Sequence, residues 1–369
     1  MFNDVLEEYD RTLRQGIPLS DSEIQKRVLT EAKRTPRRAW LRGVSSTILV
    51  QSANDASRAY RNWFDSLGKR RRGPRVGRPR WKSRKSRNQS IRFTRNAFGV
   101  TSRGVRLAKI GDVKLAWSRP LPSEPSSVTV IREADGRFYV SFVVQIETAS
   151  LPEVETIAGM DLGLADLAVV VRSDGTREKV SNPRYLLRRQ RRLIRAQKAL
   201  SRKQKGSKNR EKARIRLAAQ HRRVRNARLD HHHKLALRLI RENQTIAVED
   251  LAIAAMARSW LGKSVHEAGW AQLLRLLEEK AVRHGRRVVR VDRWTPTSRL
   301  CSVCKNNAGP KPLRVRAWTC TNCRSELDRD FNAALNVLDA AGLAESLNAC
   351  GAGVRLRLAG AIRDEAGTH

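Results

Sequence analysis

The sequence predicts a multidomain α+β protein with a helical lobe, a small β-barrel and an α/β domain that carries an inserted cysteine ribbon. Apolar residues first recur at helical spacing, then alternate with a period of two, and finally form apolar strands that alternate with helices. A chain of 369 residues has room for about two or three domains. The predicted boundaries are 1–67 for the helical lobe, 68–90 for a basic linker, 91–150 for the barrel, 151–345 for the α/β domain and 346–369 for a flexible tail.

The helical lobe and the linker differ in composition. Within the lobe, apolar residues stand three or four apart at Leu49, Ala53, Ala56 and Tyr60, which is the spacing of one helix face. The linker contains KRRRGPRVGRPRWKSRKSRNQS, which is too basic and too rich in glycine and proline to pack a core. We interpret the linker as a segment that contacts phosphates.

The barrel region changes to a period of two, which is typical of short strands. Asp135 and Gly136 form a hairpin-turn signal between two of them. The alternating apolar residues are Ile91, Phe93, Val128, Val130, Phe138, Val140, Phe142 and Val144. Short strands of this kind predict a small barrel.

The α/β domain combines apolar strands with helices. The predicted strands lie in TIAGMDLGLADLAVVV, TIAVEDL and RRVVRVD, and the later helices cover 268–284 and about 330–343. Residues 184–228 contain one acidic residue, Glu211, and predict two basic helices broken near Gly206 and Ser207. Like charge at this density repels itself unless a polyanion neutralises it, so these helices indicate nucleic-acid contact.

The whole chain is strongly basic. It has 75 Lys plus Arg against 36 Asp plus Glu, a formal charge of +39. Nucleic acid is the favoured partner because each contacted phosphate releases condensed counterions. No apolar run approaches the roughly 20 residues that span a bilayer, and the first residues, MFNDVLEEYD, do not resemble a signal peptide. We therefore expect no membrane partner and a cytoplasmic location.

Four of the five cysteines form the pattern C-x2-C-x15-C-x2-C. Two CxxC pairs bring four thiolates to tetrahedral positions around one Zn²⁺ and leave no position for water, so we predict a structural zinc ion. A redox or disulfide function is the less specific alternative. Cys350 stands outside the pattern. The predicted ligands are Cys301, Cys304, Cys320 and Cys323, within a ribbon over 296–327.

Three acidic residues stand where a strand ends or a helix begins. Asp161 and Glu249 each end an apolar strand, and Asp330 opens the last helix. In a chain this basic, such carboxylates indicate divalent cations, Mg²⁺ or Mn²⁺, and a two-metal site supports phosphodiester hydrolysis. The alternatives are a turn former at Asp161, a surface charge at Glu249 and a helix cap at Asp330.

Other polar residues stay outside the predicted site. His231, His232 and His233 are consecutive, and on a helix their side chains point to different sides and cannot share one ion. The acidic residues that we leave out are Asp166, Asp250, Asp292 and Asp328.

From roughly its start to Leu343 the chain resembles the TnpB proteins of insertion sequences, a family ancestral to type V CRISPR effectors. The resemblance is most specific from Gly159 onward. The matching segments are GMDLGLADLAVV, RRLIRAQKALSRKQKGSKNREKAR, HHKLALRLI, AVEDLAI, AGWAQLLRLLEEKAVRHGRRVVRVDRWTPTSRLCSVC, WTCTNC and DRDFNAALNVL.

The resemblance implies a fold and an activity. It implies a recognition lobe, a wedge barrel and a RuvC-like nuclease domain of RNase H fold, with Asp161, Glu249 and Asp330 as the catalytic triad. It also implies an RNA-guided DNA endonuclease that uses a transposon-derived guide RNA, recognises a short motif beside its double-stranded target and cuts with Mg²⁺ at a single site. A monomer bound to RNA would then hold the guide–target heteroduplex by its backbone and A-form shape.

Three alternatives remain open. One is a compact type V CRISPR effector, the second is a nuclease-inactive RNA-guided repressor, and the third is a DNA transposase. The presence of all three carboxylates disfavours the repressor. Family members usually begin with an extra strand and helix, whereas this chain starts at MFNDVLEEYD, so we expect either a start that is too late or a shortened chain.

Overall fold

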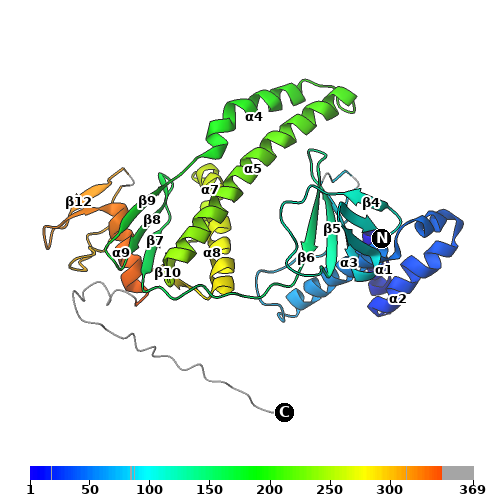
Figure 1. Cartoon of the computed structure of the whole chain (residues 1–369), viewed down its shortest axis with the longest axis horizontal. Coiled ribbons are helices and arrows are strands. Elements are labelled where there is room, and N and C mark those ends of the chain that lie inside the picture. The colour runs from blue at the N-terminus through cyan, green and yellow to red at the C-terminus, as the bar shows by residue number, and fades with distance from the viewer. Residues whose placement is uncertain (18, 84, 87, 313, 343–369) are drawn as a thin grey trace, which may run out of the picture. The chain divides into compact units, whose positions relative to one another are not determined.

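A computed structural model describes residues 1–17, 19–83, 85–86, 88–312 and 314–342 (Figure 1). The chain divides into two compact units. The first comprises Met1–Glu147 and Ala199–Ala219, and the second comprises Thr148–Lys198 and Gln220–His369. The predicted tail, 346–369, lies outside the described residues.

The first unit begins with helices. They are α1 (Phe2–Gln15), α2 (Asp21–Gln25), a π-helical turn (Lys26–Glu31), 3-10 turns (Ala32–Arg34 and Pro36–Gly43) and α3 (Ser46–Leu67). Ser20 caps α2 because its hydroxyl accepts from the Glu23 amide while the Glu23 carboxylate accepts from the Ser20 amide. The predicted apolar face of α3 is confirmed, since Leu49, Ala53 and Tyr60 are all buried.

Six short strands follow, and they pair as two antiparallel sheets in the orders β1-β5-β6 and β2-β3-β4. Their bounds are β1 (Gln89–Thr94), β2 (Phe98–Thr101), β3 (Gly104–Leu107), β4 (Gly111–Lys114), β5 (Ser127–Arg132) and β6 (Phe138–Val143). Phe93, Val105 and Val128 share one core. The hairpin at Gly136 is confirmed. A closed barrel stays a prediction, because the described strands pair as two separate sheets.

The second unit is built on a five-stranded sheet in the order β11-β10-β7-β8-β9. Strands β7, β8 and β9 form an antiparallel meander, and β10 and β11 run parallel to β7. The carboxyl ends of β7, β10 and β11 therefore meet at one edge. The bounds are β7 (Ile157–Asp161), β8 (Asp166–Arg172), β9 (Arg177–Ser181), β10 (Thr245–Glu249) and β11 (Arg287–Val291).

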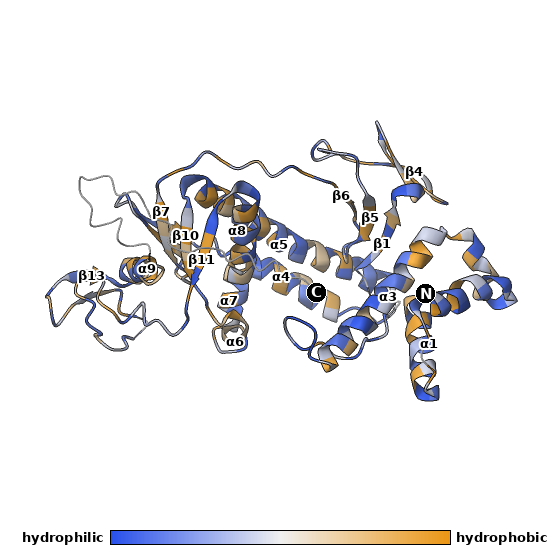
Figure 2. Cartoon of the chain, turned by 90° about the horizontal axis from the view of Figure 1, so that it is seen from below, coloured by the Kyte–Doolittle hydropathy of each residue, from blue (hydrophilic) through white to orange (hydrophobic). Residues whose placement is uncertain are grey.

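Helices cover both faces of this sheet (Figure 2). Helix α9 (Arg329–Ala340) lies on one face, while α8 (Trp270–His284) and the second half of α5 (Lys208–Glu242) lie on the other. Met160 and Ile246 face α5 and α8, whereas Gly159 faces α9. A Cβ on Gly159 would lie 2.3 Å from the Ala334 carbonyl oxygen, so glycine is required for α9 to approach the sheet this closely.

The two predicted basic helices are confirmed as α4 (Tyr185–Ser201) and α5, with the break in between. Helix α5 continues past 228 to Glu242, because Leu235, Leu239 and Ile240 are buried against the sheet. The helix predicted over 268–284 is confirmed as α8, which begins at Trp270. Gly269, whose φ is 68°, separates it from the preceding α7 (Gly262–Ala268). In the described part of the chain, no helix has the length and apolar character needed to cross a membrane.

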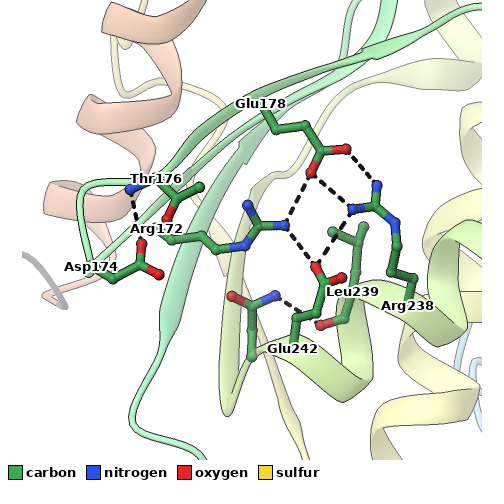
Figure 3. A network of polar contacts seen from close by, with 8 residues as sticks. Arg172, Asp174, Thr176, Glu178, Arg238, Leu239 and Glu242 are labelled. Atoms are coloured by element: carbon green, nitrogen blue, oxygen red, sulfur yellow. Dashed lines mark hydrogen bonds and ion pairs between the residues drawn. The ribbon is translucent and has the colours of Figure 1, made fainter.

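A buried arginine ties α5 to the sheet (Figure 3). Arg172, 7% exposed, donates to Glu178 of β9 at 3.0 Å and to Glu242 of α5 at 2.7 Å. Arg238 of α5 donates to both Glu178 oxygens, at 2.9 and 2.6 Å. The two arginines hold the pKa of the Glu178 carboxyl below its usual value. This network fixes α5 on the sheet beside β8 and β9.

Candidate functional site

The three predicted carboxylates come together at one edge of the sheet. Asp161 ends β7 and Glu249 ends β10, and the register pairs Met160 with Val248, so the two acidic residues occupy adjacent strand ends. Asp330 lies in the first turn of α9, which packs against β7, β8 and β10. Two strand ends and one helix start thus supply the three acidic side chains.

Burial raises the pKa of two carboxylates at this edge. Burial, together with the negative charges of Glu249 and Asp330, raises the pKa of Asp161 to about 7. Burial also raises the pKa of Glu249, against the effect of a hydrogen bond from the Thr297 hydroxyl. Carboxylates that repel one another in a partly buried site are suited to holding cations.

The carboxylates do not form a tight cage. In the residues that the structure describes, only the four cysteines bring three or more potential ligand atoms within 4.8 Å of one another. Among the described residues, the oxygens of the three carboxylates are therefore not all within 4.8 Å of one another. Each Asp330 oxygen lies 3.3 Å from Nη1 of Arg316, an exposed arginine of the cysteine ribbon.

The acidic residues left out of the prediction have other contacts. Asp328 is the N-cap of α9, where its carboxylate accepts 3.0 Å bonds from the amides of Asp330 and Phe331. Asp250 pairs with Arg290 and Arg293. The carboxylate of Asp292 accepts from the Trp294 amide. Asp166 begins β8.

The four cysteines form two matching turns. Cys301 Sγ lies 3.7 Å from Cys323 Sγ, and Cys304 Sγ lies 3.6 Å from Cys320 Sγ. In each CxxC pair the amide of the first cysteine donates to the carbonyl five residues on, and the residue after the second cysteine is left-handed, with φ 60° at Lys305 and 59° at Arg324. The short strands β12 (Ala317–Thr319) and β13 (Glu326–Asp328) flank the second turn. The cluster can bind a tetrahedral metal ion.

Sequence reasoning missed Thr297, Arg316, Asn332 and Asn336. Thr297 contacts Glu249 and Arg316 contacts Asp330, and neither has a local signature. The two asparagines, 1% and 2% exposed, offered the only signal, because they stand four apart on the otherwise apolar buried side of the last helix.

The basic helices present an exposed cationic surface. Helix α4 has only one fully buried residue, Leu193. Its exposed arginines are Arg188, Arg191, Arg192 and Arg195. A row of exposed guanidinium groups is the expected surface for a phosphate backbone.

Two family models match the chain. The OrfB_IS605 family, described as "Probable transposase", matches residues 141–259. The TNB domain of Cas12f1-like proteins matches residues 270–337. Together they cover the five-stranded sheet, the two basic helices and the cysteine ribbon.

Known proteins resemble the chain as well. A Streptomyces pristinaespiralis protein named "Putative RNA-guided DNA endonuclease" is 41% identical over 331 residues, which is 89% of this chain and 78% of that protein. "TnpB-like protein L79" of Acanthamoeba polyphaga mimivirus is 24% identical over 241 residues, 61% of this chain and 45% of that protein.

A solved structure has a similar fold. It is the "Cryo-EM structure of the Cas12f1-sgRNA-target DNA complex", with a TM-score of 0.53 and 16% identity over 91% of this chain and 79% of that one. The family models agree with the segments on which the resemblance in the sequence rests. On the strength of its 41% identity to a relative that it largely spans, this chain belongs to the TnpB family.

Proposed function

We propose that this chain is an RNA-guided DNA endonuclease that hydrolyses phosphodiester bonds at Asp161, Glu249 and Asp330. The observation that carries the proposal is the meeting of these three carboxylates at one sheet edge, where burial and mutual repulsion raise the pKa of Asp161 to about 7. The name of the Streptomyces pristinaespiralis relative supports the same activity.

The sheet supports a RuvC-like domain of RNase H fold over 151–345. An antiparallel meander continued by two parallel strands on the far side of its first strand, in the order β9-β8-β7-β10-β11, is the arrangement that such a domain requires. By the same family reasoning, we assign 1–67 to a recognition lobe, 68–90 to a linker and 91–150 to the wedge barrel.

Different residues of the site would have different functions in the proposed reaction. Asp161, Glu249 and Asp330 would hold Mg²⁺ or Mn²⁺, which in a two-metal site activates the attacking water and stabilises the leaving oxygen. The strand ends of β7 and β10 and the first turn of α9 fix the directions from which these ligands approach. Arg316, beside Asp330, offers a positive charge where a substrate phosphate would lie.

The cysteine turns and the basic helices have supporting functions. Four thiolates in two matched turns suit a structural Zn²⁺, which would order the ribbon that carries Arg316. The exposed arginines of α4 suit the backbones of a transposon-derived guide RNA and of the guide–target heteroduplex. We assign the active form to one chain bound to one guide RNA.

Two alternatives keep the RNA guide. A type V CRISPR effector would use the same site with a guide from a repeat array. A nuclease-inactive repressor is disfavoured, because all three carboxylates are present and adjacent. Neither alternative accounts for the "Probable transposase" family match as directly as a transposon-encoded nuclease.

The test compares two neighbouring carboxylates. Glu249→Gln should abolish target cleavage in Mg²⁺, as should Asp161→Ala, while guide-directed DNA binding stays within about twofold because neither carboxylate touches the basic helices. Asp250→Asn is the matched control, since Asp250 follows Glu249 directly but pairs with Arg290 and Arg293. Cleavage of a plasmid target by the purified RNA complex is measured. Full cutting by Glu249→Gln would refute the assignment.

A further inference from the structure

Residues 296–302, here called the connector, follow β11 and include Cys301, the first residue of the first cysteine pair. They contact the carboxylate cluster, by which we mean Asp161, Glu249 and Asp330, through Thr297. Thr297, 4% exposed, donates a hydrogen bond from its hydroxyl to Oε1 of Glu249. The Thr297 carbonyl in turn accepts a 2.8 Å bond from Nδ2 of Asn336 in α9. The connector therefore bridges Glu249 and α9.

Two buried amides of α9 hold the connector. Asn336 donates a second bond from Nδ2 to the Leu300 carbonyl at 2.8 Å, and Nδ2 of Asn332 donates to the same oxygen at 2.7 Å. Oδ1 of Asn332 accepts from the Ser302 amide at 2.8 Å. Burying an amide costs free energy unless it is hydrogen-bonded, and these directional bonds specify one position of the connector.

The same helix carries a carboxylate of the cluster. Asp330 lies in the first turn of α9, two residues before Asn332. Cys301 lies inside the connector, between the two residues whose backbone Asn332 contacts. One helix thus fixes Asp330 directly, fixes Glu249 through Thr297, and anchors the first cysteine turn.

We propose that Thr297, Asn332 and Asn336 are positioning residues of the carboxylate cluster. Thr297 orients the Glu249 carboxylate, and the two amides hold Thr297 where its hydroxyl reaches that carboxylate. The inference rests on the proposed metal-dependent nuclease, because the oriented group is a ligand of its divalent cation. Loss of an orienting partner of a metal ligand lowers metal affinity, whereas loss of a merely structural contact lowers stability alone.

The first test measures Mn²⁺ binding to the full-length, zinc-loaded chain by electron paramagnetic resonance, with Asp161→Ala as the background. Thr297→Val keeps the shape of the side chain and removes the hydroxyl. Its Mn²⁺ affinity should fall about tenfold or more. Thr297→Ser, which restores the hydroxyl, should return the affinity to near the wild-type value.

The second test separates positioning from burial. Asn336→Asp keeps the volume and removes both donors, so it should also weaken Mn²⁺ binding. Asn243→Asp is the matched control: Asn243 is buried directly after α5, its Nδ2 donates to the Leu239 carbonyl at 2.9 Å, and its Oδ1, like that of Asn336, lacks a partner in the described part of the chain. The control should lower the melting temperature and leave Mn²⁺ affinity unchanged.

The results decide each part separately. Wild-type Mn²⁺ affinity in Thr297→Val would overturn the assignment of Thr297, and an equal loss in Asn336→Asp and Asn243→Asp would overturn that of the amides. Cleavage by the RNA complex is followed in parallel as a function of Mg²⁺ concentration. A wild-type chain that binds Mn²⁺ but does not cut contradicts the proposed function while the Thr297→Val comparison still decides the inference. A wild-type chain with no binding above the Asp161→Ala background overturns both.

Discussion

At the scale of single residues, His232 shows how packing changes a titration. It lies in α5 against α8, is 1% exposed, and its Nδ1 has no partner among the residues that the structure describes. Burial lowers its pKa to about 4, with smaller contributions from His231 and Arg228. An imidazole in this position stays neutral in the folded protein through the mildly acidic range.

This neutrality predicts a pH dependence of stability. Because the folded pKa lies below the ordinary 6.5, the unfolded chain binds the proton more readily, so stability is full above pH 6.5 and falls as the pH drops towards 4. At pH 5 the loss from this one group is on the order of 2 kcal/mol. In His232→Leu, the free energy of unfolding measured with urea should therefore differ less between pH 7 and pH 5 than it does in the wild type.

The control for this prediction is the exposed His221, also in α5. His221→Leu should leave the pH dependence as in the wild type. If the curves of His232→Leu and the wild type shift equally between the two pH values, another group causes the acid sensitivity.

At the scale of elements, the stability of the cysteine ribbon depends strongly on its four cysteines. Strands β12 and β13 have three residues each, and most of the ribbon is only partly buried. So small a unit lacks an apolar core, and the proposed zinc ion would supply its folding free energy. The ribbon holds Arg316 beside Asp330, so its order also affects the carboxylate site.

Removal of one thiolate tests this dependence. Cys304→Ser should release the zinc ion and raise amide exchange in β12 and β13, because three thiolates cannot close a tetrahedral structural site. Metal content and hydrogen exchange are measured on the purified protein. Cys350→Ser, which removes the cysteine outside the pattern, should retain zinc, and a zinc-loaded Cys304→Ser protein would contradict the ligand assignment.

The elements also show what the sequence can predict. Strand ends at Asp161 and Glu249 and the break between α4 and α5 follow from local patterns of apolar residues, and the structure agrees with them. The extension of α5 to Glu242 depends on packing against a sheet that is distant in sequence. Thr297 escaped prediction because its partner Glu249 is 48 residues away, and a lone threonine carries no sign of such a contact.

At the scale of the whole molecule, charge is the dominant property. A formal charge of +39 over 369 residues opposes compaction unless a polyanion neutralises part of it. Acidic side chains are concentrated in ion pairs, such as Arg106 with Asp112 and Arg275 with Glu279, which leaves other arginines available for phosphates. Affinity for nucleic acid should accordingly depend steeply on salt.

The exposed arginines of α4 should account for part of that dependence. Replacing Arg191, Arg192 and Arg195 by glutamine should reduce the slope of log Kd against log salt by about one for each phosphate that is no longer neutralised, or about three in all. Binding of an RNA–DNA heteroduplex is measured over a salt series. Arg11, Arg106 and Arg275, each already paired with a carboxylate, form the control triple with the same loss of formal charge. Because an ion-paired arginine releases few counterions on binding, the control slope should stay near the wild-type value. Equal slopes in the two triple variants would mean that net charge, and not the α4 surface, governs binding.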